Sequence, residues 1–200
     1  LQISKNFAID TERGGIAVEY IITNRSDEVQ AFAPWEVSRV HPNGLTFYPT
    51  GETKLGSGPF DELTTQDING VTWFKYDHQA IQTNQKLYAD GAEGWLAHVY
   101  GDKLLVKAFQ DVPLERQAPT EGEIEIFANA SSPYVELEQQ GPYAEIRPQE
   151  SLSWTVHWFL RKLPSNWVAE VGDRKLVDFV RQIVSPQPQV TTTLATVSRQ

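Results

Sequence analysis

Apolar and polar residues alternate with a period of two along most of this chain. The alternation is regular over residues 16–23 and 152–160, where every second side chain is Ile, Val, Leu, Tyr or Trp. This pattern is typical of half-buried β-strands. Shorter runs separated by turn residues predict further strands near 45–48, 71–76, 86–89, 95–100, 104–109, 123–126 and 134–140. Many short strands at this spacing predict an all-β fold of antiparallel sheets, either a sandwich or a barrel.

One late segment has helical rather than strand periodicity. Over 173–184 the apolar residues recur at helical spacing, and Asp173 can cap the N-terminus of a helix there. The segment that follows is polar and begins with Pro186-Gln187-Pro188. We therefore expect a single β-sandwich domain over 1–185 with one short C-terminal helix, and an extended or disordered tail over 186–200.

Residues 50–67 show little periodicity and are rich in Gly, Thr and acidic side chains. This composition predicts a long loop. Loops of such length often belong to binding sites, so this segment is a candidate for the border of one.

The predicted strand over 134–140 carries the most informative row of side chains. Val135 and Leu137 take one face. The other face carries a phenol, two carboxylates and an amide: Tyr134, Glu136, Glu138 and Gln140. Such a row is too polar for a core, so it faces either water, as most charged rows on strands do, or a concave polar site. In a site, the interaction of the two carboxylates can hold one of them partly protonated and poised as a general base.

A second candidate lies over 33–39, where Trp35 and Glu36 interrupt an otherwise apolar strand. With Trp35 in the core, Glu36 points away toward Arg39 or solvent. Alternatively, Trp35 is an aromatic platform and Glu36 a carboxylate at the rim of a cleft. An aromatic ring beside carboxylates and amides suits sugar binding, because the apolar face of a pyranose stacks on the ring while polar groups bind its hydroxyls.

A third candidate spans 86–95. Lys86 and Tyr88 share one strand face, and Asp90 and Glu93, each followed by glycine, form a tight acidic connection before Trp95. This segment is either a hairpin with solvated turn charges or a loop that presents Asp90 or Glu93 to a ligand.

Composition narrows the class of partner. The chain has 200 residues, enough for one domain with a sizeable core, and a formal net charge of −9. This charge and the lack of a basic stripe argue against nucleic acid as a partner. Cysteine is absent, which excludes disulfides and thiolate sites. No apolar run is long enough to predict a membrane-spanning segment.

The histidines do not form a recognisable metal motif. None of His41, His78, His98 and His157 has the spacing to a second ligand that a zinc site needs. A calcium ion held by oxygen ligands stays open. No glycine-rich phosphate loop, nucleophile elbow or dinucleotide motif is present, so no cofactor is predicted. His41, just before a Pro-Asn-Gly turn, is either incidental or an acid.

The chain enters directly on a strand-like alternation, with no signal segment and no methionine. We therefore expect it to be the later part of a longer polypeptide, or a processed form, in which N-terminal strands and any signal peptide are missing. The compartment, whether periplasmic, secreted or cytoplasmic, stays open, as does the oligomeric state.

Several motifs together resemble an uncharacterised bacterial family within the galactose mutarotase-like (aldose 1-epimerase-like) superfamily. The resemblance extends from about Phe7 to Leu163 and includes a Trp-rich last strand. It is carried by these segments: TNRSD at 23–27, APWEV at 33–37, KLYADGAEGWLA at 86–97, LVKAF at 105–109 and YVELEQQGP at 134–142.

This resemblance implies an antiparallel β-supersandwich with a sugar cleft on one face. The superfamily's aldose 1-epimerases open and close a sugar ring with a glutamate base, in a late Leu-Glu-x-Gln-like strand, and a histidine acid. Residues 137–140 read Leu-Glu-Gln-Gln, which makes Glu138 the implied base. Where the epimerases have the histidine, this chain reads Ala-Pro-Trp-Glu at 33–36, so Glu36 or His41 would have to supply the acid.

The resulting hypothesis is a carbohydrate-binding protein with epimerase-type activity. In it, Trp35 and Trp95 are stacking platforms. The polar residues expected to contact a sugar or glycan are Lys86, Asp90, Glu93, Glu136 and Gln140. One alternative is a non-catalytic glycan-binding or structural module. Another is a glycosidase or lyase that uses paired carboxylates, which requires Glu36 and Glu138 to converge across a cleft.

Overall fold

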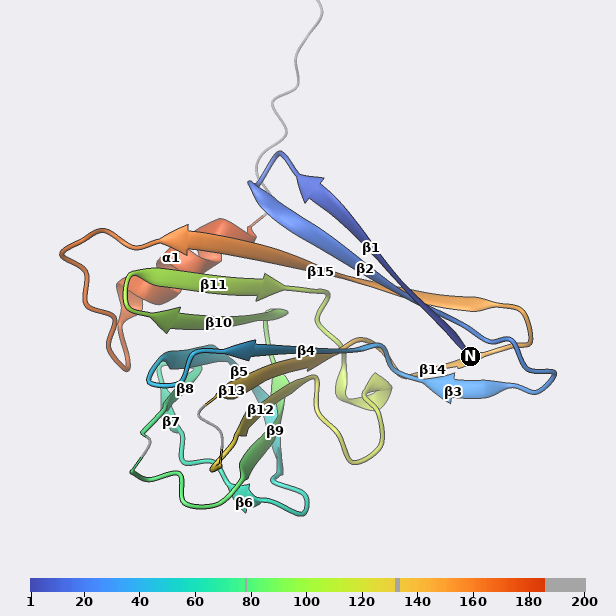
Figure 1. Cartoon of the computed structure of the whole chain (residues 1–200), viewed down its shortest axis with the longest axis horizontal. Coiled ribbons are helices and arrows are strands. Elements are labelled where there is room, and N and C mark those ends of the chain that lie inside the picture. The colour runs from blue at the N-terminus through green and yellow to red at the C-terminus, as the bar shows by residue number, and fades with distance from the viewer. Residues whose placement is uncertain (78, 132–133, 186–200) are drawn as a thin grey trace, which may run out of the picture.

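The computed structural model describes residues 1–77, 79–131 and 134–185, and most of it is β-strand (Figure 1). The tail predicted over 186–200 lies outside the described residues. Within them, the elements follow in this order: β1 (Gln2–Asp10), β2 (Gly15–Thr23), β3 (Gln30–Phe32), β4 (Trp35–Val40), β5 (Leu45–Gly56), β6 (Asp61–Glu62), β7 (Gln66–Ile68), β8 (Val71–Lys75), β9 (Gln85–Gly91), β10 (Trp95–Tyr100), β11 (Lys103–Ala108), the 3-10 helix η1 (Leu114–Arg116), β12 (Ile124–Ala128), β13 (Val135–Gln140), β14 (Ala144–Ile146), β15 (Ser151–Lys162) and α1 (Arg174–Val184).

Most strands join one continuous sheet in the order β1-β2-β15-β11-β10-β5-β9-β12-β13-β4. Strands β8 and β7 extend from β5, while β6 pairs with β9, and β14 and β3 form a separate pair. Among the pairings in the described part of the chain, β6 with β9 is parallel and the others are antiparallel. The sheet is therefore built almost entirely from antiparallel neighbours.

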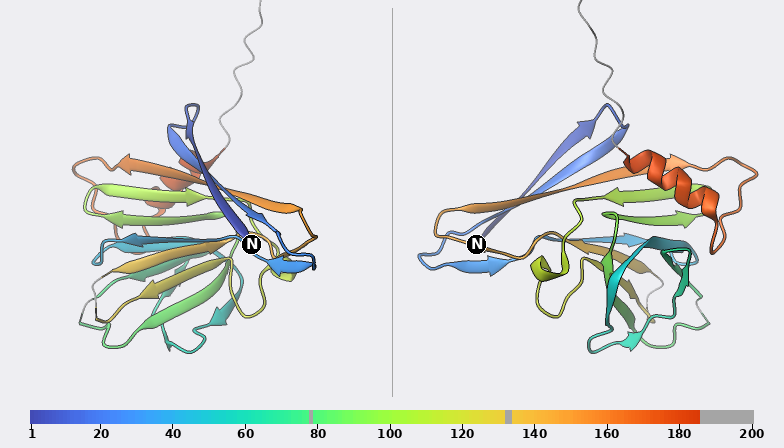
Figure 2. Two further views of the ribbon diagram at one scale, coloured as in Figure 1. Left: turned by 45° about the vertical axis from the view of Figure 1, so that its right-hand side comes forward. Right: turned by 180° about the vertical axis from the view of Figure 1, so that it is seen from behind.

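The long strand β5 belongs to both halves of this sheet. Its residues 45–49 pair with β8 and, in part, with β10, whereas residues 50–56 pair with β9 after two shifts of register. Irregularities of this kind bend a strand and increase its twist. The sheet consequently folds over, and β10, β11 and β15 form one layer above β4, β13, β12 and β9 (Figures 1 and 2).

Two of the three hydrophobic clusters in the described residues contain most of the buried side chains, and each fully buried aliphatic or aromatic side chain contributes roughly 1.5–3 kcal/mol. The core between the two halves of the sheet includes Tyr48, Phe74, Leu87, Leu96, Ile124, Ile126 and Leu137. The core between α1 and the layer of β10, β11 and β15 includes Phe47, Trp73, Trp95, Val106, Phe159, Leu176, Val177 and Val180. The outer face of β9, β12 and β13 lies outside both cores, and it carries the polar row.

Helix α1 begins where the periodicity places it. The carboxylate of Asp173 accepts hydrogen bonds from the backbone N–H groups of Lys175, at 3.0 Å, and Leu176, at 3.3 Å. These bonds satisfy two of the donors that a helix N-terminus leaves free. The predicted all-β antiparallel sandwich with one short C-terminal helix is therefore confirmed.

The loop predicted over 50–67 is wrong in part. Strand β5 continues to Gly56, and the short strands β6 and β7 include residues 61–62 and 66–67 of the remainder. The extension exists because β5 changes partner and pairs with β9, more than thirty residues further along the chain. A pairing at such separation has no local signal in a stretch of Gly, Thr and acidic residues.

A buried ion pair joins the two layers. Lys107 on β11 places its Nζ 2.7 Å from Oε1 of Glu36 on β4. Three further donors complete the shell of this carboxylate: Tyr20 OH at 2.6 Å, Gln139 Nε2 at 2.6 Å and Trp158 Nε1 at 3.0 Å. Both charged groups are excluded from solvent, and such a pair is tolerated only when its hydrogen bonds are satisfied in this way.

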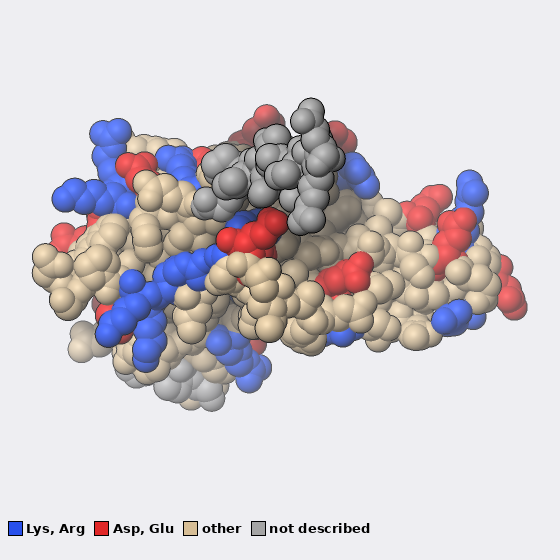
Figure 3. Space-filling view, turned by 90° about the horizontal axis from the view of Figure 1, so that it is seen from above, with Lys and Arg blue, Asp and Glu red and all other residues tan. Residues whose placement is uncertain are grey.

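On the face drawn in Figure 3, acidic and basic side chains are interspersed rather than separated into large patches. In the described part of the chain, no helix has the length and apolar character needed to cross a membrane.

The Lys107–Glu36 pair predicts a large loss of stability when one partner is removed. Lys107→Met leaves an unpaired buried carboxylate, and we expect the free energy of unfolding in urea at pH 7 to fall by roughly 3–5 kcal/mol. The double variant Lys107→Met/Glu36→Gln should recover part of this loss, because the buried charge is gone. Lys162→Met, in an exposed pair with Asp102, is the control and should change little. Equal losses in the single and double variants would contradict a role for charge pairing.

Candidate functional site

The register of β13, β12 and β9 decides which polar side chains meet on their outer face. Glu138 on β13 lies opposite Glu125 on β12, and Glu125 lies opposite Tyr88 on β9. Side chains in such positions have Cβ atoms about 5 Å apart, so the two carboxylates are direct neighbours. Like charges at this distance repel one another unless a cation or a proton compensates for one of them.

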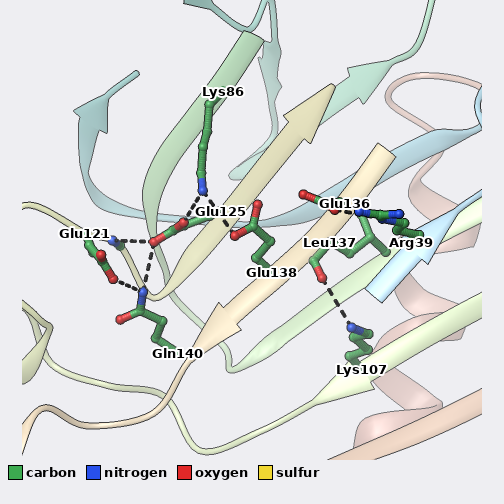
Figure 4. A network of polar contacts seen from close by, with 10 residues as sticks. Arg39, Lys86, Lys107, Glu121, Glu125, Glu136, Leu137, Glu138 and Gln140 are labelled. Carbon is green, nitrogen blue, oxygen red and sulfur yellow. Dashed lines mark hydrogen bonds and ion pairs between the residues drawn. The ribbon is translucent and has the colours of Figure 1, made fainter. Parts of the chain in front are cut away.

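Lys86 supplies the cation. It lies on β9, two residues before Tyr88 and therefore on the same face. Its Nζ is 2.7 Å from Glu125 Oε2 and 3.1 Å from Glu138 Oε2 (Figure 4). The structure thus brings together two of the predicted site residues, Lys86 and Glu138, and adds a third residue, Glu125, that was not predicted.

The amide of Gln140 and a backbone group hold the second oxygen of Glu125. Gln140 Nε2 donates to Glu125 Oε1 at 3.1 Å and also to the carboxylate of Glu121 (Figure 4). The N–H of Gly122 points to the same Oε1 at 3.4 Å. Glu125 therefore accepts hydrogen bonds on both oxygens, as a carboxylate that becomes ionised in a buried place requires.

Burial changes the ionisation of this cluster. Desolvation raises the pKa of both Glu125 and Glu138, and the nearby charge of Lys86 opposes this rise without cancelling it. The pKa of Lys86 is lowered by burial, but its contacts with Glu125 and then Glu138 outweigh that effect and leave it above its ordinary value. The arrangement therefore favours a charged lysine and one proton shared by two carboxyl groups.

Two aromatic rings lie beside Lys86. Its Nζ is 4.8 Å from the centroid of the Tyr88 ring and 5.7 Å from that of Trp35. Trp35 begins the edge strand β4, next to Gln140 on β13, and 52% of its surface is exposed. An exposed indole thus stands at the border of the buried Lys86–Glu125–Glu138 cluster.

Glu136 lies on the same face as Glu138 but has a different partner. Its Oε1 accepts a hydrogen bond from Arg39 Nε at 2.9 Å, across the β13–β4 pair (Figure 4). The guanidinium of Arg39 also lies over the ring of Tyr134, 4.3 Å from its centroid. The predicted row is thereby divided into a half-exposed Arg39–Glu136 pair and a buried cluster around Glu138.

The prediction that Glu36 is a site carboxylate is wrong. Glu36 lies between the layers, where Lys107 and three neutral donors bind its carboxylate, and not on the outer face that carries Glu138. The residue beside Glu138 across the β13–β4 pair is Val37, so Glu36 points to the opposite face. Glu36 and Glu138 therefore do not converge, and a hydrolytic pair built from them has no basis in the geometry.

The predicted positions of Trp95, as a stacking platform, and of His41, as an acid near Glu138, are also wrong. Trp95 is fully buried in the core under α1, next to Phe47, so it cannot stack on a ligand. The ring of His41 stacks on Tyr100, with centroids 3.8 Å apart, and its Nδ1 contacts the carbonyl oxygen of Pro42. The structure thus brings His41 to Tyr100 rather than to Glu138.

The two carboxylates of the acidic connection over 90–93, Asp90 and Glu93, lie in different surroundings. The carboxylate of Asp90 accepts hydrogen bonds from the N–H of Glu52, at 2.9 Å, and from Nε2 of Gln117, at 2.5 Å, and borders a cavity of about 490 Å³. Glu93 pairs with Arg181 on α1 at 2.5 Å and accepts from the indole of Trp95 at 3.1 Å. Both carboxylates thus have protein partners, and neither contacts the cluster around Glu138.

Sequence reasoning missed Glu125 and Glu121. A signal for Glu125 exists, because Glu123 and Glu125 alternate with the apolar residues Ile124 and Ile126 over 123–126. That alternation places Glu125 on a polar face, but only the register of β12 against β13 shows that this is the face of Glu138.

Within the described ranges, no group of three or more His, Cys, Asp or Glu side chains is arranged to hold a metal ion. The chemistry that the cluster itself offers is proton transfer. It holds a carboxyl pair with raised pKa values, a lysine that fixes their positions, and an amide and an indole that can contact a polyhydroxylated ligand.

A comparison with protein families matches the model described as "Domain of unknown function (DUF4380)" to residues 1–161. A comparison with curated proteins finds no match.

Among solved structures, a candidate aldose 1-epimerase from Escherichia coli K12 has a TM-score of 0.50 and 13% identity, over 80% of this chain and 60% of that one. A TPR-domain containing protein from Parabacteroides distasonis has a TM-score of 0.53 and 14% identity, over 86% of this chain and 34% of that one. A galactose mutarotase-like protein from Clostridium acetobutylicum has a TM-score of 0.46 and 10% identity, over 80% and 56%. This chain thus spans less than two thirds of the length of each. The likeness to the first two of these structures shows the fold alone, an antiparallel β-sandwich of the galactose mutarotase-like kind.

The cluster predicts a pH-dependent effect of removing Lys86. Because the pKa values of Glu125 and Glu138 are raised in the folded protein, their favourable contribution is complete at low pH and is lost as the pH rises through the folded values. Lys86→Met removes the cation that limits this loss. We expect the free energy of unfolding to fall by roughly 3 kcal/mol at pH 8 and by clearly less at pH 5.

Urea unfolding at the two pH values measures this difference. Lys162→Met, whose partner Asp102 is exposed, serves as the control and should show a small effect that does not change between them. A loss of stability in Lys86→Met that is equal at both pH values would contradict the assigned ionisation.

Proposed function

The chain belongs to the DUF4380 family, and we propose that this member binds a neutral sugar on the outer face of β13, β12 and β9 and accelerates the exchange of its anomers. The observation that carries the proposal is the buried Glu138–Glu125 pair, held by one lysine beside an exposed indole. The likeness to a candidate aldose 1-epimerase supports it only at the level of the fold, since one fold hosts many functions.

Glu138 is the base in this proposal. Glu138 lies in the Leu-Glu-Gln-Gln segment of β13 that resembles the late strand of the epimerases, and its carboxylate contacts Lys86 on β9. Ring opening requires removal of the proton from the anomeric hydroxyl, and burial raises the pKa of Glu138 toward the range in which a carboxylate performs this step well.

Trp35 supplies the binding surface. Its indole is half-exposed and lies over Lys86, so a pyranose that stacks on the indole brings its hydroxyls near the cluster. Glu138 itself is 1% exposed, so in this proposal the cluster opens at the edge strand β4, with Trp35 kept as the platform, when the sugar binds. Stacking of the apolar sugar face on an indole is a common source of affinity for carbohydrates.

The charge of the face favours a neutral ligand. Lys86 contacts two carboxylates and Arg39 contacts Glu136, so these two cations of the face are already paired. Among the side chains that the structure describes on this face, a phosphate would meet carboxylates and no free cation, which is unfavourable. Neutral aldoses are therefore the expected ligand class.

A glycosidase mechanism fits this geometry less well. Hydrolysis of a glycosidic bond uses two carboxyl groups, at least about 5 Å apart, on either side of the scissile bond. Here the ammonium group of Lys86 contacts an oxygen of both Glu125 and Glu138, so a cation occupies the place between them that the scissile bond would take.

Saturation-transfer and exchange NMR with neutral aldoses, and with sugar phosphates in parallel, tests the function. We expect binding and faster anomer exchange for neutral aldoses alone. Glu138→Gln should lower the exchange rate by at least about 100-fold without loss of the fold. Glu145→Gln, a change of the same kind at an exposed position on β14, is the control. Binding without faster exchange would instead indicate a non-catalytic glycan-binding module, and no binding would refute the proposal.

Trp35→Ala tests the binding surface separately. Loss of the indole should raise the Kd for a neutral aldose by about tenfold, or about 1.4 kcal/mol. The same NMR titration measures this value. Because Trp35 is half-exposed on an edge strand, the melting temperature should change little. An unchanged Kd would remove Trp35 from the site while leaving Glu138 in question.

A further inference from the structure

We propose that Glu125 is the acid of this site and that it shares one proton with Glu138 across the β12–β13 pair. This inference rests on the proposed function and deepens it. The ring opening of an aldose needs an acid as well as a base. The residues first expected to supply the acid, Glu36 and His41, lie elsewhere, one between the layers and one against Tyr100.

The register makes Glu125 the direct neighbour of Glu138. The two residues are cross-strand partners on the same face, and one ammonium group contacts an oxygen of each. Two carboxylates and one lysine leave one negative charge uncompensated in a buried place, and the nearby negative charges of Glu121 and Glu136 add to this excess. A single proton removes that charge, which favours the state in which one carboxyl is neutral and the other ionised.

The reaction needs its acid and base close together. The anomeric hydroxyl oxygen and the ring oxygen of an aldose are bonded to the same carbon. A base on the first and an acid on the second must therefore be adjacent. Carboxyl groups on neighbouring strands, about 5 Å apart at Cβ, meet this requirement, whereas groups at opposite ends of a cleft do not.

The surroundings of Glu125 stabilise it after it loses its proton. Its Oε2 contacts Lys86, and its Oε1 accepts from Gln140 Nε2 and faces the N–H of Gly122. These three donors stabilise the carboxylate formed when the proton leaves. Burial raises the pKa of Glu125, so the group can be protonated near neutral pH before the sugar reacts.

The proton transfers balance in both directions. Glu138 takes the proton of the anomeric hydroxyl while Glu125 gives its proton to the ring oxygen. The bond between the anomeric carbon and the ring oxygen breaks, and the anomeric carbon–oxygen bond becomes a carbonyl. After rotation of the open-chain aldehyde, the hydroxyl formed from the former ring oxygen attacks the other face of the carbonyl. This hydroxyl returns its proton to Glu125, and Glu138 returns its proton to the carbonyl oxygen, which becomes the anomeric hydroxyl again.

Anomer exchange in Glu125→Gln, Glu138→Gln and the control Glu145→Gln tests the assignment. We expect Glu125→Gln to keep sugar binding, to lower the exchange rate by at least about 100-fold, and to lose the alkaline limb of the pH–rate profile, because that limb reports loss of the acid's proton. A loss of structure alone would not change the shape of the profile. Exchange that is lost in Glu138→Gln but unchanged in Glu125→Gln would overturn this inference and leave the proposed function standing.

A second measurement needs no sugar. Carbon NMR of protein labelled at the glutamate carboxyl carbons follows the ionisation of each group with pH. Burial raises the pKa of Glu123 to about 8, so a titration from Glu123 is expected in every variant. For the Glu125–Glu138 pair we expect one further titration well above the ordinary range of glutamate in the wild type. In Glu125→Gln, the pKa of the remaining Glu138 should be lower than in the wild type, because its like-charged neighbour is gone and Lys86 then pairs with Glu138 alone. Ordinary pKa values for both carboxyls in the wild type would refute proton sharing, whatever the outcome of the sugar experiments.

Discussion

Strand β13 buries charge on both of its faces, and the surrounding structure depends on how each charge is compensated. On the inner face, the side chain of Gln139 reaches Glu36, and Lys107 contacts that carboxylate and the carbonyl of Leu137. On the outer face, Glu138 contacts Lys86. Each face thus contains one buried lysine from a different strand, and neither lysine can leave without exposing an unpaired charge to a medium of low dielectric constant. The ion pairs thereby also define the register of β13 against its neighbours.

The two lysines differ in the number of carboxylates they contact, and this difference separates structure from chemistry. Lys107 pairs with Glu36 alone, burial lowers its pKa, and three neutral donors complete the shell of the carboxylate. The two opposite charges of that pair cancel, so protonation of Glu36 is not needed to neutralise it. Lys86 contacts two carboxylates, and burial raises the pKa of each. With both carboxylates ionised, the outer cluster therefore carries one excess negative charge near neutral pH. Binding of a proton by one of the two carboxylates removes this charge, so a proton-exchanging group is favoured there.

Alternation in the sequence predicted the strands and the polar row well, because a period of two is a local property. It could not say which face of a strand turns inward. For β4 the two options differ by one position, and Trp35 is exposed while Glu36 is buried. Trp95 lies on a strand that is buried on both faces, where alternation has no meaning. Glu125 was missed for another reason. Its partner is thirteen residues further along the chain, and only the β12–β13 register makes them neighbours.

The resemblance to the epimerases predicted a base but left the acid without a residue, since 33–36 read Ala-Pro-Trp-Glu where the histidine is expected. The geometry shows which residues stand near Glu138 instead. Trp35 occupies the edge next to Gln140, and a second carboxyl, Glu125, lies across from Glu138. A histidine and a buried carboxylic acid can perform the same task, because the ring oxygen needs a donor that is protonated near neutral pH and whose conjugate base is stabilised after the proton is transferred. In this chain, Gln140, Lys86 and burial together can give a glutamate that property. In the proposed mechanism, Glu125 thus takes the place of the histidine that this chain lacks at 33–36.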